Sequence, residues 1–336
     1  MHAIRLHAFG PAGNLTYEEI PDPVPGPGQA RVRVAAAGVH LIDTALREGK
    51  RGPFPALPEL PTVPGREIAG TVDALGAGTD PSWLGRRVVA HLGTAPGGYA
   101  ELAVTDADRL HDLPGHLGEA EAIAMVGTGR TTLGILRFTT LGPDSVVLVT
   151  AAAGGIGTLL VQYAKNAGAT VVGLAGGPDK TARVRANGAD LAVDYLRTDW
   201  AEEVRTYLDD RVGRRATVVF DSVGGTTGRA AVGLLARGGQ HLVFGWSSAG
   251  ADDGEPLVFT EDELAERGIT SEVVVGPAML QRAGGDFRRL ELAALAAAAA
   301  DGTLRPAVHS FPLKDAAAAH HALETRGTTG KVVLVP

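Results

Sequence analysis

Short runs of aliphatic and β-branched residues characterise the first 110 positions of the chain. Clear examples lie at residues 30–35 and 68–74, and clusters of proline and glycine separate such runs. This pattern is typical of strands joined by turns. The segment 21–28 (PDPVPGPG) is too rich in proline for a helix or a central strand, because proline lacks the amide hydrogen that both require. We therefore expect a β-rich region with a rigid surface connection.

The pattern changes at about residue 119, where helical stretches begin to alternate with short apolar runs. A helix is predicted over 119–140, and the apolar runs 146–150 and 170–174 enclose a glycine-rich loop and a helix over 157–167. Such a β–α–β unit is the signature of a parallel sheet. The alternation continues with predicted helices at 179–186, 198–208, 227–235 and 287–300, and with predicted strands at 191–194, 217–220, 240–244 and 270–275. The segment 308–336 has the pattern strand–helix–strand.

The length, net charge and cysteine content of the chain limit the classes of protein to which it can belong. A chain of 336 residues is long for one core, so two domains are expected. The net charge of −7 argues against general binding to nucleic acid or to a membrane surface, and cysteine is absent, which excludes disulfides, thiolate catalysis and cysteine-ligated zinc. No apolar run approaches the roughly 20 residues of a membrane span, and residues 1–13 lack the pattern of a signal peptide. We therefore expect a cytoplasmic protein.

The loop between the two apolar runs carries the residues of a dinucleotide site. Ala152, Gly154 and Gly157 occupy the three special positions of the G-x-G-x-x-G pattern, with alanine in the first, and Gly155 adds another small residue. Small residues let backbone N–H groups approach a pyrophosphate, and the N-terminus of the following helix then faces the anion. A packing turn is the alternative interpretation. The strand before the loop, and the helix and strand after it, favour dinucleotide binding.

The end of the second apolar run indicates which dinucleotide binds. NAD sites place an acidic residue about 20 positions after the glycine loop, where it bonds the ribose 2′-OH. Residues 173–177 (GLAGG) contain no acid, and the cations Lys180 and Arg183 follow. Cations attract a 2′-phosphate, so NADPH is predicted. Alternatively, Lys180 and Arg183 form the solvated face of a helix, which the neighbouring Asp179 favours.

The chain as a whole resembles the quinone oxidoreductases, which are zinc-independent medium-chain dehydrogenases/reductases. The similarity rests on AAAGGIG, Lys180 in GGPDK, Asp194-Tyr195, FDSVGG and FGWSS in the central part, on PGPGQARVRVAAAGVHLID, PGREIAGTV and GGYAEL before it, and on FPLKDAAAAHHALETRGTTGKVVLVP after it. It implies an α/β fold in which residues 1–120 and 302–336 form a GroES-like, β-rich catalytic domain. Residues 121–301 would form an inserted Rossmann domain, a doubly wound parallel sheet that binds NADPH. It also implies a homodimer formed by edge strands at 270–275, with 257–259 nearby.

The resemblance also assigns roles to individual residues. Lys180 and Tyr195 would hold the adenosine 2′-phosphate, and Gly155 and Ile156 would line the pyrophosphate. Thr131 would lie near the nicotinamide ribose, and Arg326 would approach the cofactor from the other domain. The residues expected to line the path from adenine to nicotinamide are Ser222, Phe244, Gly245 and Ser247. Each has a structural alternative; Phe244, for instance, could belong to the core.

No metal site is predicted. Zinc-dependent relatives carry a cysteine and a histidine where this chain has His40 and Arg66, and Glu67 alone remains of that ligand set. A catalytic zinc needs three protein ligands, and Arg66 would place a fixed positive charge beside the metal. The neighbours His320 and His321 point about 100° apart on a helix, so they cannot share one metal face.

The catalytic candidates are His40 and Asp43. Without a metal, hydrogen-bond donors must stabilise the charge that develops on a carbonyl oxygen, and His40 could donate to that oxygen or protonate it, with Asp43 orienting the ring. Family members often carry asparagine at His40 and tyrosine near Ala45 and Arg51, which puts simple quinones in doubt. We expect reduction of a quinone or an α,β-unsaturated ketone. The alternatives are an enoyl-thioester or polyketide-tailoring reductase, and a protein that binds NADPH without turnover.

Overall fold

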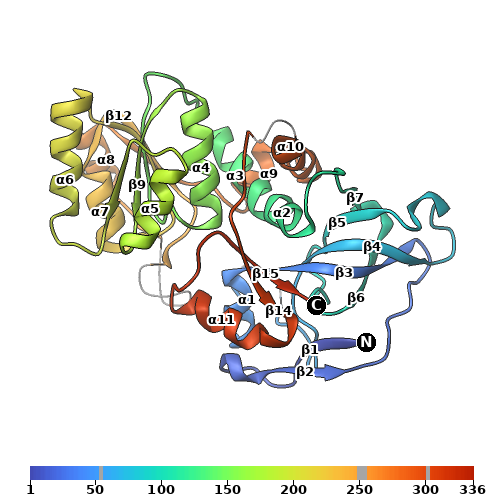
Figure 1. Ribbon diagram of the computed structural model, residues 1–336. Helices are drawn as coiled ribbons and strands as arrows, with labels where there is room; N and C mark the ends of the chain where they lie inside the picture. Colours follow the sequence, from blue (N-terminus) through green and yellow to red (C-terminus); the bar gives the residue numbers. More distant parts are fainter. Residues whose placement is uncertain (53–55, 248–255, 300–302) are drawn as a thin grey trace. The chain divides into compact units, whose positions relative to one another are not determined.

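The computed structural model describes residues 1–52, 56–247, 256–299 and 303–336, which fall into two compact units (Figure 1). Unit 1 comprises Met1–Gly129, Ala294–Ala299 and Pro306–Pro336. Unit 2 comprises Arg130–Ala293 together with 303–305. The predicted end of the last long helix at 300, the predicted domain boundary at 301–302 and the final serine of the FGWSS motif lie outside the described residues.

Unit 1 is built on a seven-stranded, mostly antiparallel sheet. Its order is β14 (Val308–Pro312), β15 (Lys331–Val335), β3 (Gln29–Val39), β4 (Glu67–Leu75), β5 (Arg87–His91) and β7 (His111–Asp112), and β6 (Leu102–Asp106) pairs with the first half of β3. The second half of β3 pairs with β15, with Val333 opposite Gly38. A separate two-stranded sheet joins β1 (His2–Leu6) to β2 (Leu15–Glu19). Strands from both ends of the chain therefore share one core, which includes Ile4, Val32, Ile68 and Leu334.

The helices of unit 1 are short. α1 (Leu41–Arg47) follows β3, α2 (Glu119–Ile123) precedes a π-helical turn over Ala124–Gly129, and α11 (Ala316–Glu324) lies between β14 and β15. Short 3₁₀ turns occur at Ala12–Asn14, Pro81–Trp83, Ala107–Arg109 and Leu313–Asp315. The sequence pattern predicted neither α1 nor the π turn.

Unit 2 contains a six-stranded sheet in which every pair of neighbours is parallel. Its order is β10 (Leu191–Asp194), β9 (Thr170–Ala175), β8 (Val146–Val149), β11 (Ala216–Asp221), β12 (Leu235–Val243) and β13 (Thr270–Val273). The chain moves outward from β8 to β10 and then returns to β11 on the other side of β8. This reversal creates a switch point between β8 and β11, where ligands bind at the carboxyl ends of parallel strands.

Helices cover both faces of this sheet, as Figure 1 shows. α3 (Arg130–Ile135), α4 (Gly155–Asn166), α5 (Pro178–Ala186) and α9 (Pro277–Arg282) contribute side chains to one apolar cluster. α6 (Trp200–Tyr207) and α7 (Gly225–Val232) contribute to a second cluster. The other helical segments are Leu136–Phe138 (3₁₀), Leu208–Val212 (π), α8 (Glu261–Arg267) and α10 (Arg288–Ala299). Among the described residues, no helix is both long and apolar enough to cross a bilayer.

Several boundaries differ from the sequence prediction. The single helix predicted over 119–140 is divided into α2, the π turn, α3 and a 3₁₀ turn. The backbone widens where Gly127 meets the carboxylate of Glu67; a Cβ atom on Gly127 would lie 1.6 Å from the Oε1 atom of Glu67. The helix predicted over 227–235 ends at Val232, and β12 already begins at Leu235. α8 and α9 were missed, although the capping box of Thr260 and Glu263 marks the start of α8.

Candidate active site

The glycine loop of unit 2 lies at the switch point. It leaves β8 through Thr150 and Ala151, and Gly154 is the N-cap of α4. A Cβ atom on Gly157 would lie 2.4 Å from the carbonyl oxygen of Ala151, so no side chain fits there. α4 is twelve residues long, and the N–H groups of its first turn have no partner within the helix. The predicted positions Ala152, Gly154, Gly155, Ile156 and Gly157 therefore form a cradle that fits a pyrophosphate.

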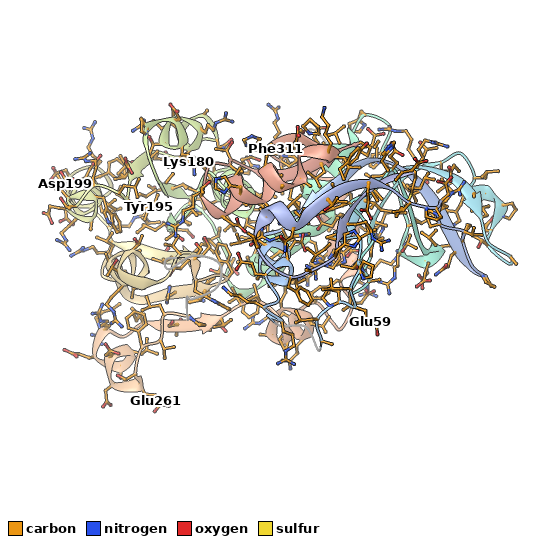
Figure 2. All side chains as sticks on the ribbon, turned by 90° about the horizontal axis from the view of Figure 1, so that it is seen from below. Glu59, Lys180, Tyr195, Asp199, Glu261 and Phe311 are labelled. Carbon is orange, nitrogen blue, oxygen red and sulfur yellow. The ribbon has the colours of Figure 1, made fainter. Side chains whose placement is uncertain are left out.

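The predicted adenosine end lies at the carboxyl ends of β9 and β10. Lys180 is in the first turn of α5, and Tyr195 directly follows β10; Figure 2 labels both. A Cβ atom on Gly176, in the loop before α5, would lie 3.7 Å from the hydroxyl oxygen of Tyr195. The structure thus brings the hydroxyl of Tyr195 close to the loop that leads into the first turn of α5, as a 2′-phosphate site there requires.

Sequence analysis named Asp194 only as part of the resemblance and gave it no role at this strand end. Asp194 is the register partner of Ala175 at the end of β9, so an acid does stand beside that strand end in space. Its Oδ1 atom accepts the amides of Gly177 at 2.9 Å and Leu196 at 3.0 Å. The carboxylate therefore shapes the loop that precedes Lys180.

The four residues predicted to line the rest of the cofactor path lie together at the carboxyl ends of β11 and β12. The amide of Phe244 donates to the carbonyl oxygen of Asp221 at 2.8 Å. The amide and the hydroxyl of Ser247 both donate to the carbonyl oxygen of Ser222 at 3.2 Å. A Cβ atom on Gly245 would lie 2.9 Å from the same oxygen.

The two remaining cofactor candidates belong to other elements. Thr131 is on α3 in unit 2, and its side chain is half-buried. Arg326 follows α11 in unit 1, where it is exposed and has a left-handed backbone with a φ of 56°. Their cofactor roles stay predictions.

The two catalytic candidates of unit 1 belong to a buried cluster of charged side chains. The Nε2 atom of His40 lies 2.8 Å from Oε1 of Glu67, and its Nδ1 atom lies 3.5 Å from Oδ2 of Asp43. The second oxygen of each carboxylate contacts another cation: Oε2 of Glu67 is 2.7 Å from the Lys331 ammonium, and Oδ1 of Asp43 is 2.8 Å from the Arg66 guanidinium. Only His40 is substantially exposed, with 25% of its side chain accessible. We call these five residues the charged cluster.

The charges of the cluster determine its protonation. Burial alone would raise the pKa of Glu67, but the His40 and Lys331 cations hold the pKa of that carboxyl far below its usual range. Burial would likewise raise the pKa of Asp43, and its bonds with His40 and Arg66 reverse the shift. For His40, burial lowers the pKa, whereas the Glu67 charge and the bonds to both carboxylates raise it above 6.5 overall, against the opposing charge of Lys331. Because carboxylates only accept hydrogen bonds, a ring facing one on each side favours the imidazolium form.

Tyr99 is hydrogen-bonded to Asp43, and His320 is hydrogen-bonded to Tyr99. The Tyr99 hydroxyl lies 3.2 Å from Oδ2 of Asp43 and 3.2 Å from Nε2 of His320. Since the carboxylate can only accept, Tyr99 donates to Asp43 and His320 donates to Tyr99. Burial lowers the pKa of His320 to about 4, which keeps its ring neutral. A second bond to Asp43 comes from the backbone amide of His40 at 2.8 Å, at the start of α1.

These residues do not fit a zinc ion. The ligand position of zinc-dependent relatives at Arg66 carries a guanidinium that is bonded to Asp43, and Glu67 is already paired with the Lys331 ammonium. Among the residues that the structure describes, no group of three or more His, Asp or Glu side chains is arranged so that it could hold a metal ion. The adjacent His320 and His321 also differ in surroundings, because His320 is buried and His321 is exposed.

Sequence analysis missed Lys331 as a member of the charged cluster, and it missed Tyr99 and His320 as the residues that support Asp43. A lysine at the first position of the buried strand β15 was the one signal that could have revealed it, because a buried ammonium needs a carboxylate partner. Nothing local marks Tyr99 or His320.

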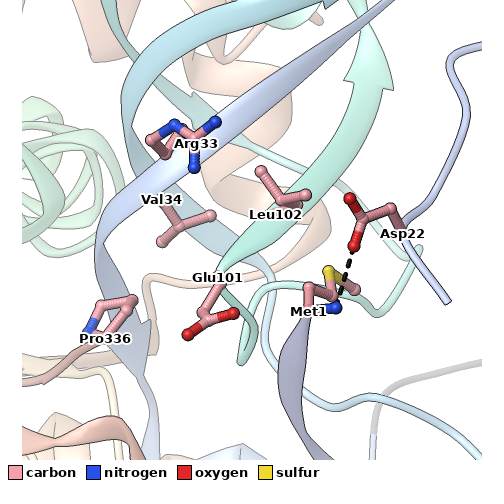
Figure 3. A pocket seen from close by; sticks show the side chains of 7 residues that line it. All are labelled: Met1, Asp22, Arg33, Val34, Glu101, Leu102 and Pro336. Atoms are coloured by element: carbon pink, nitrogen blue, oxygen red, sulfur yellow. Dashed lines mark hydrogen bonds and ion pairs between the residues drawn. The ribbon is translucent and has the colours of Figure 1, made fainter. Parts of the chain in front are cut away.

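A cavity of about 410 Å³ occurs elsewhere in unit 1 (Figure 3). Its lining includes Arg33, Glu101 and Leu102, and the amino group of Met1 pairs with Asp22 at its edge at 2.8 Å. None of the predicted site residues lines it, so it is separate from the candidate site.

A parallel sheet with a glycine loop at its switch point, together with an antiparallel sheet completed by both ends of the chain, defines a medium-chain dehydrogenase/reductase. Two family models match, an alcohol dehydrogenase GroES-like domain over residues 26–115 and a zinc-binding dehydrogenase domain over residues 187–334. The second description concerns a family that includes zinc enzymes.

Individual proteins similar to this chain identify its family within the medium-chain dehydrogenases/reductases. A quinone oxidoreductase of Pseudomonas aeruginosa is 33% identical over 99% of both chains, and a 2-haloacrylate reductase of a Burkholderia species is 32% identical over 98% of both. The crystal structure of Escherichia coli quinone oxidoreductase complexed with NADPH superimposes with a TM-score of 0.83, at 29% identity over 100% of both chains. The chain belongs to the quinone oxidoreductase family of medium-chain dehydrogenases/reductases and is an oxidoreductase.

Proposed function

We propose that this chain reduces a quinone or an α,β-unsaturated carbonyl compound with NADPH, and that it does so without a metal. The observation that carries the proposal is the arrangement at the carboxyl ends of β8, β9 and β10. The glycine cradle fits a pyrophosphate there, and Lys180 and Tyr195 stand at the neighbouring strand ends. The relative from Escherichia coli, whose structure holds NADPH, supports the choice of cofactor.

When bound, NADPH supplies the hydride for the reaction. The backbone amides at the start of α4 would hold its pyrophosphate, and Lys180 with Tyr195 would hold its 2′-phosphate. His40 would stabilise the negative charge that develops on the carbonyl oxygen of the substrate. Its Nε2 atom is bonded to Glu67, and its Nδ1 atom is buried 3.5 Å from Asp43, so the imidazolium would act on the substrate through its positive charge. Asp43 and Glu67 keep the ring oriented and charged.

The charged cluster favours substrates that develop or carry negative charge. Three cations face two carboxylates, and the exposed member is an imidazole. This fits an enolate intermediate, and it also fits an unsaturated acid or thioester, for which the 2-haloacrylate reductase provides a related example. NADPH oxidation should be measured with quinones, enones, enoyl thioesters and acrylates. Turnover of none of them, in a protein that binds NADPH, would favour a role in binding alone.

Lys180→Ala tests the cofactor preference. The change should weaken NADPH binding by about 1–3 kcal/mol, because a charge-assisted bond to the 2′-phosphate is lost. NADH binding should stay nearly constant, since NADH lacks that phosphate. Titration calorimetry with both cofactors gives the two affinities. Lys165→Ala is the matched control, because its ammonium pairs with Asp190 at 2.8 Å near the other end of α4. Equal loss for both cofactors would mean that Lys180 has only a structural role.

Zinc analysis tests the proposal of metal independence. We expect purified protein to contain less than about 0.1 zinc per chain, because a structural or catalytic site needs three or four protein ligands. Prolonged treatment with EDTA should leave both the turnover and the melting temperature unchanged. Elemental analysis of dialysed protein is the measurement. One zinc per chain that resists dialysis would contradict the proposal.

We also propose a homodimer formed through the edge strand β13. This strand has no neighbour on its outer side among the described residues of the sheet, and Val273 on it is 42% exposed. Val258, close to it in sequence, is 74% exposed. An open edge strand invites pairing, and pairing across a two-fold axis closes it. Light scattering at micromolar concentration should give twice the chain mass of 34.5 kDa. Val273→Lys should shift the mass toward the monomer.

A further inference from the structure

Asp221 is a buried carboxylate that belongs neither to the predicted site residues nor to the residues that act in the proposed reaction. It is the last residue of β11, at the switch point of the parallel sheet, and its side chain is fully buried. Its Oδ1 atom accepts the Thr150 hydroxyl at 3.1 Å, the Val223 amide at 2.9 Å and the Gly224 amide at 3.0 Å. Its Oδ2 atom lies 3.2 Å from Nε2 of His241. The carboxylate is thus surrounded by hydrogen-bond donors.

The direction of each bond follows from what the groups can donate. A carboxylate only accepts, so Nε2 of His241 carries a proton. In the neutral ring Nδ1 then accepts, and the hydroxyl of Ser271 on β13, 2.8 Å away, is its donor. The Thr150 hydroxyl donates a hydrogen bond to Asp221 and accepts one from the Ser222 amide at 2.9 Å. Burial alone would raise the pKa of Asp221, but the bonds from His241, Gly224 and Val223 lower it, so the carboxylate stays charged.

The groups held by Asp221 are those that shape the cofactor path. Thr150 is the residue between β8 and the glycine loop, and residues 222–224 form the turn between β11 and α7. The carbonyl oxygen of Ser222 in turn holds Ser247. α7 packs closely over the carboxylate, because a Cβ atom on Gly228 would lie 2.3 Å from Oδ2 of Asp221. One carboxylate therefore fixes the exits of β8 and β11 on both sides of the switch point.

We propose that Asp221 is the positioning residue of the nicotinamide half of the cofactor site, and that His241, tied to Ser271, holds Asp221 in place. The inference rests on the proposed binding of NADPH. A packing role alone would not explain a charged group here, because a buried ion is costly and an apolar residue of similar size would fill the space. The four bonds among Asp221, Thr150, Ser222 and the turn 223–224 instead order the backbone that would face the cofactor.

A matched pair of threonine variants tests this without touching Asp221. Thr150→Val removes the hydroxyl that links Asp221 to the Ser222 amide. Thr217→Val removes a hydroxyl that also joins β8 to β11, through the Val146 amide at 3.0 Å and the Val146 carbonyl oxygen at 3.1 Å, but at the amino ends of the strands. We expect Thr150→Val to weaken NADPH binding by about 5–10-fold, the effect of one lost hydrogen bond. Thr217→Val should leave the NADPH affinity within about twofold of wild type, with a similar change in melting temperature.

Replacing Asp221 with asparagine gives a spectroscopic test of the proton arrangement. The amide oxygen of Asn can keep the bonds to Thr150 and the turn, but its NH₂ group would face His241. The ring must then accept at Nε2 and carry its proton on Nδ1, where it donates to Ser271. Imidazole ¹⁵N chemical shifts should show this exchange of tautomer in Asp221→Asn, and His241→Gln assigns the signal. NADPH affinity should fall by less than about threefold in Asp221→Asn, but by more than about tenfold in Asp221→Ala.

The outcomes distinguish a failure of the proposed function from a failure of the positioning role of Asp221. Failure of wild-type protein to bind NADPH would overturn the proposed function and this inference with it. If wild type binds NADPH, and Thr150→Val binds it as tightly as Thr217→Val, the proposed function stands and the positioning role of Asp221 is wrong. An unchanged tautomer of His241 in Asp221→Asn would also overturn the positioning role, because the carboxylate would then not be the partner of Nε2. This last measurement needs no cofactor, and Thr150→Val keeps the test valid if Asp221→Ala fails to fold.

Discussion

Replacing His40 with alanine is expected to lower kcat by about 10²–10³, which is the loss seen when one donor to a developing oxyanion is removed. His40 is the exposed member of the charged cluster, and its ring lies between the carboxylates of Asp43 and Glu67. The affinity for NADPH should stay nearly constant, because His40 is in unit 1 and would act on the substrate. Steady-state kinetics, combined with a cofactor titration, measure both quantities.

The dependence of kcat on pH gives an independent readout. The carboxylates raise the pKa of His40, so the ring keeps its proton to a higher pH than an ordinary histidine and loses it as the pH rises through that raised value. If the cation stabilises the enolate, kcat should fall with rising pH in wild type, and this limb should be absent in His40→Ala. His7→Ala is the control: His7 also pairs with a glutamate, Glu18, at 3.1 Å, but it is exposed. A folded His40→Ala variant with normal kcat would show that His40 has a structural role.

Replacing Lys331 with methionine should lower the free energy of unfolding by about 3–5 kcal/mol, the usual effect of removing one partner of a buried ion pair. Methionine keeps the length of the side chain but leaves one oxygen of Glu67 without its cation, 2.7 Å from where the ammonium had been. Glu67 is fully buried and Lys331 is 4% exposed, so water cannot replace the lost bond. Urea denaturation followed by circular dichroism gives the change.

Two further variants test whether the loss of stability in Lys331→Met comes from the unpaired charge of Glu67. Lys314→Met removes an exposed lysine from the same unit and should change the unfolding free energy by less than about 0.5 kcal/mol. The double variant Glu67→Gln with Lys331→Met should recover part of the stability, because the remaining group is no longer charged. A Lys331→Met protein as stable as wild type would show that the ion pair contributes nothing to the fold.

A structural feature could be predicted from the sequence when the residues that determine it lie close together along the chain. The glycine loop, Lys180 and the alternation of strands and helices in unit 2 are encoded within short segments, where spacing and hydrophobic period determine the structure. The π turn at Gly127 is different, because its cause is the carboxylate of Glu67 on β4. Helix propensity alone cannot reveal such a contact.

The same reasoning applies to the candidate site. His40 and Asp43 lie three residues apart, and sequence analysis recognised both as candidates. The surrounding residues Lys331, Tyr99 and His320 come from β15, the segment before β6, and α11, and only the tertiary fold brings them together. The network around Asp221 also joins β8, β11, β12 and β13, so no single segment contains its pattern.

The antiparallel sheet of unit 1 has a consequence for how the chain is made on the ribosome. Strand β15 pairs with β3 and supplies Lys331 to Glu67, yet it follows the whole of unit 2 in the sequence. Unit 2 is almost continuous, so its sheet can form as soon as its own residues have emerged, since domains generally fold as units during synthesis. The first 129 residues, in contrast, must wait with an incomplete sheet and an uncompensated Glu67 until β15 arrives. During that interval the open edge of β3 is exposed to wrong pairing and to binding by chaperones.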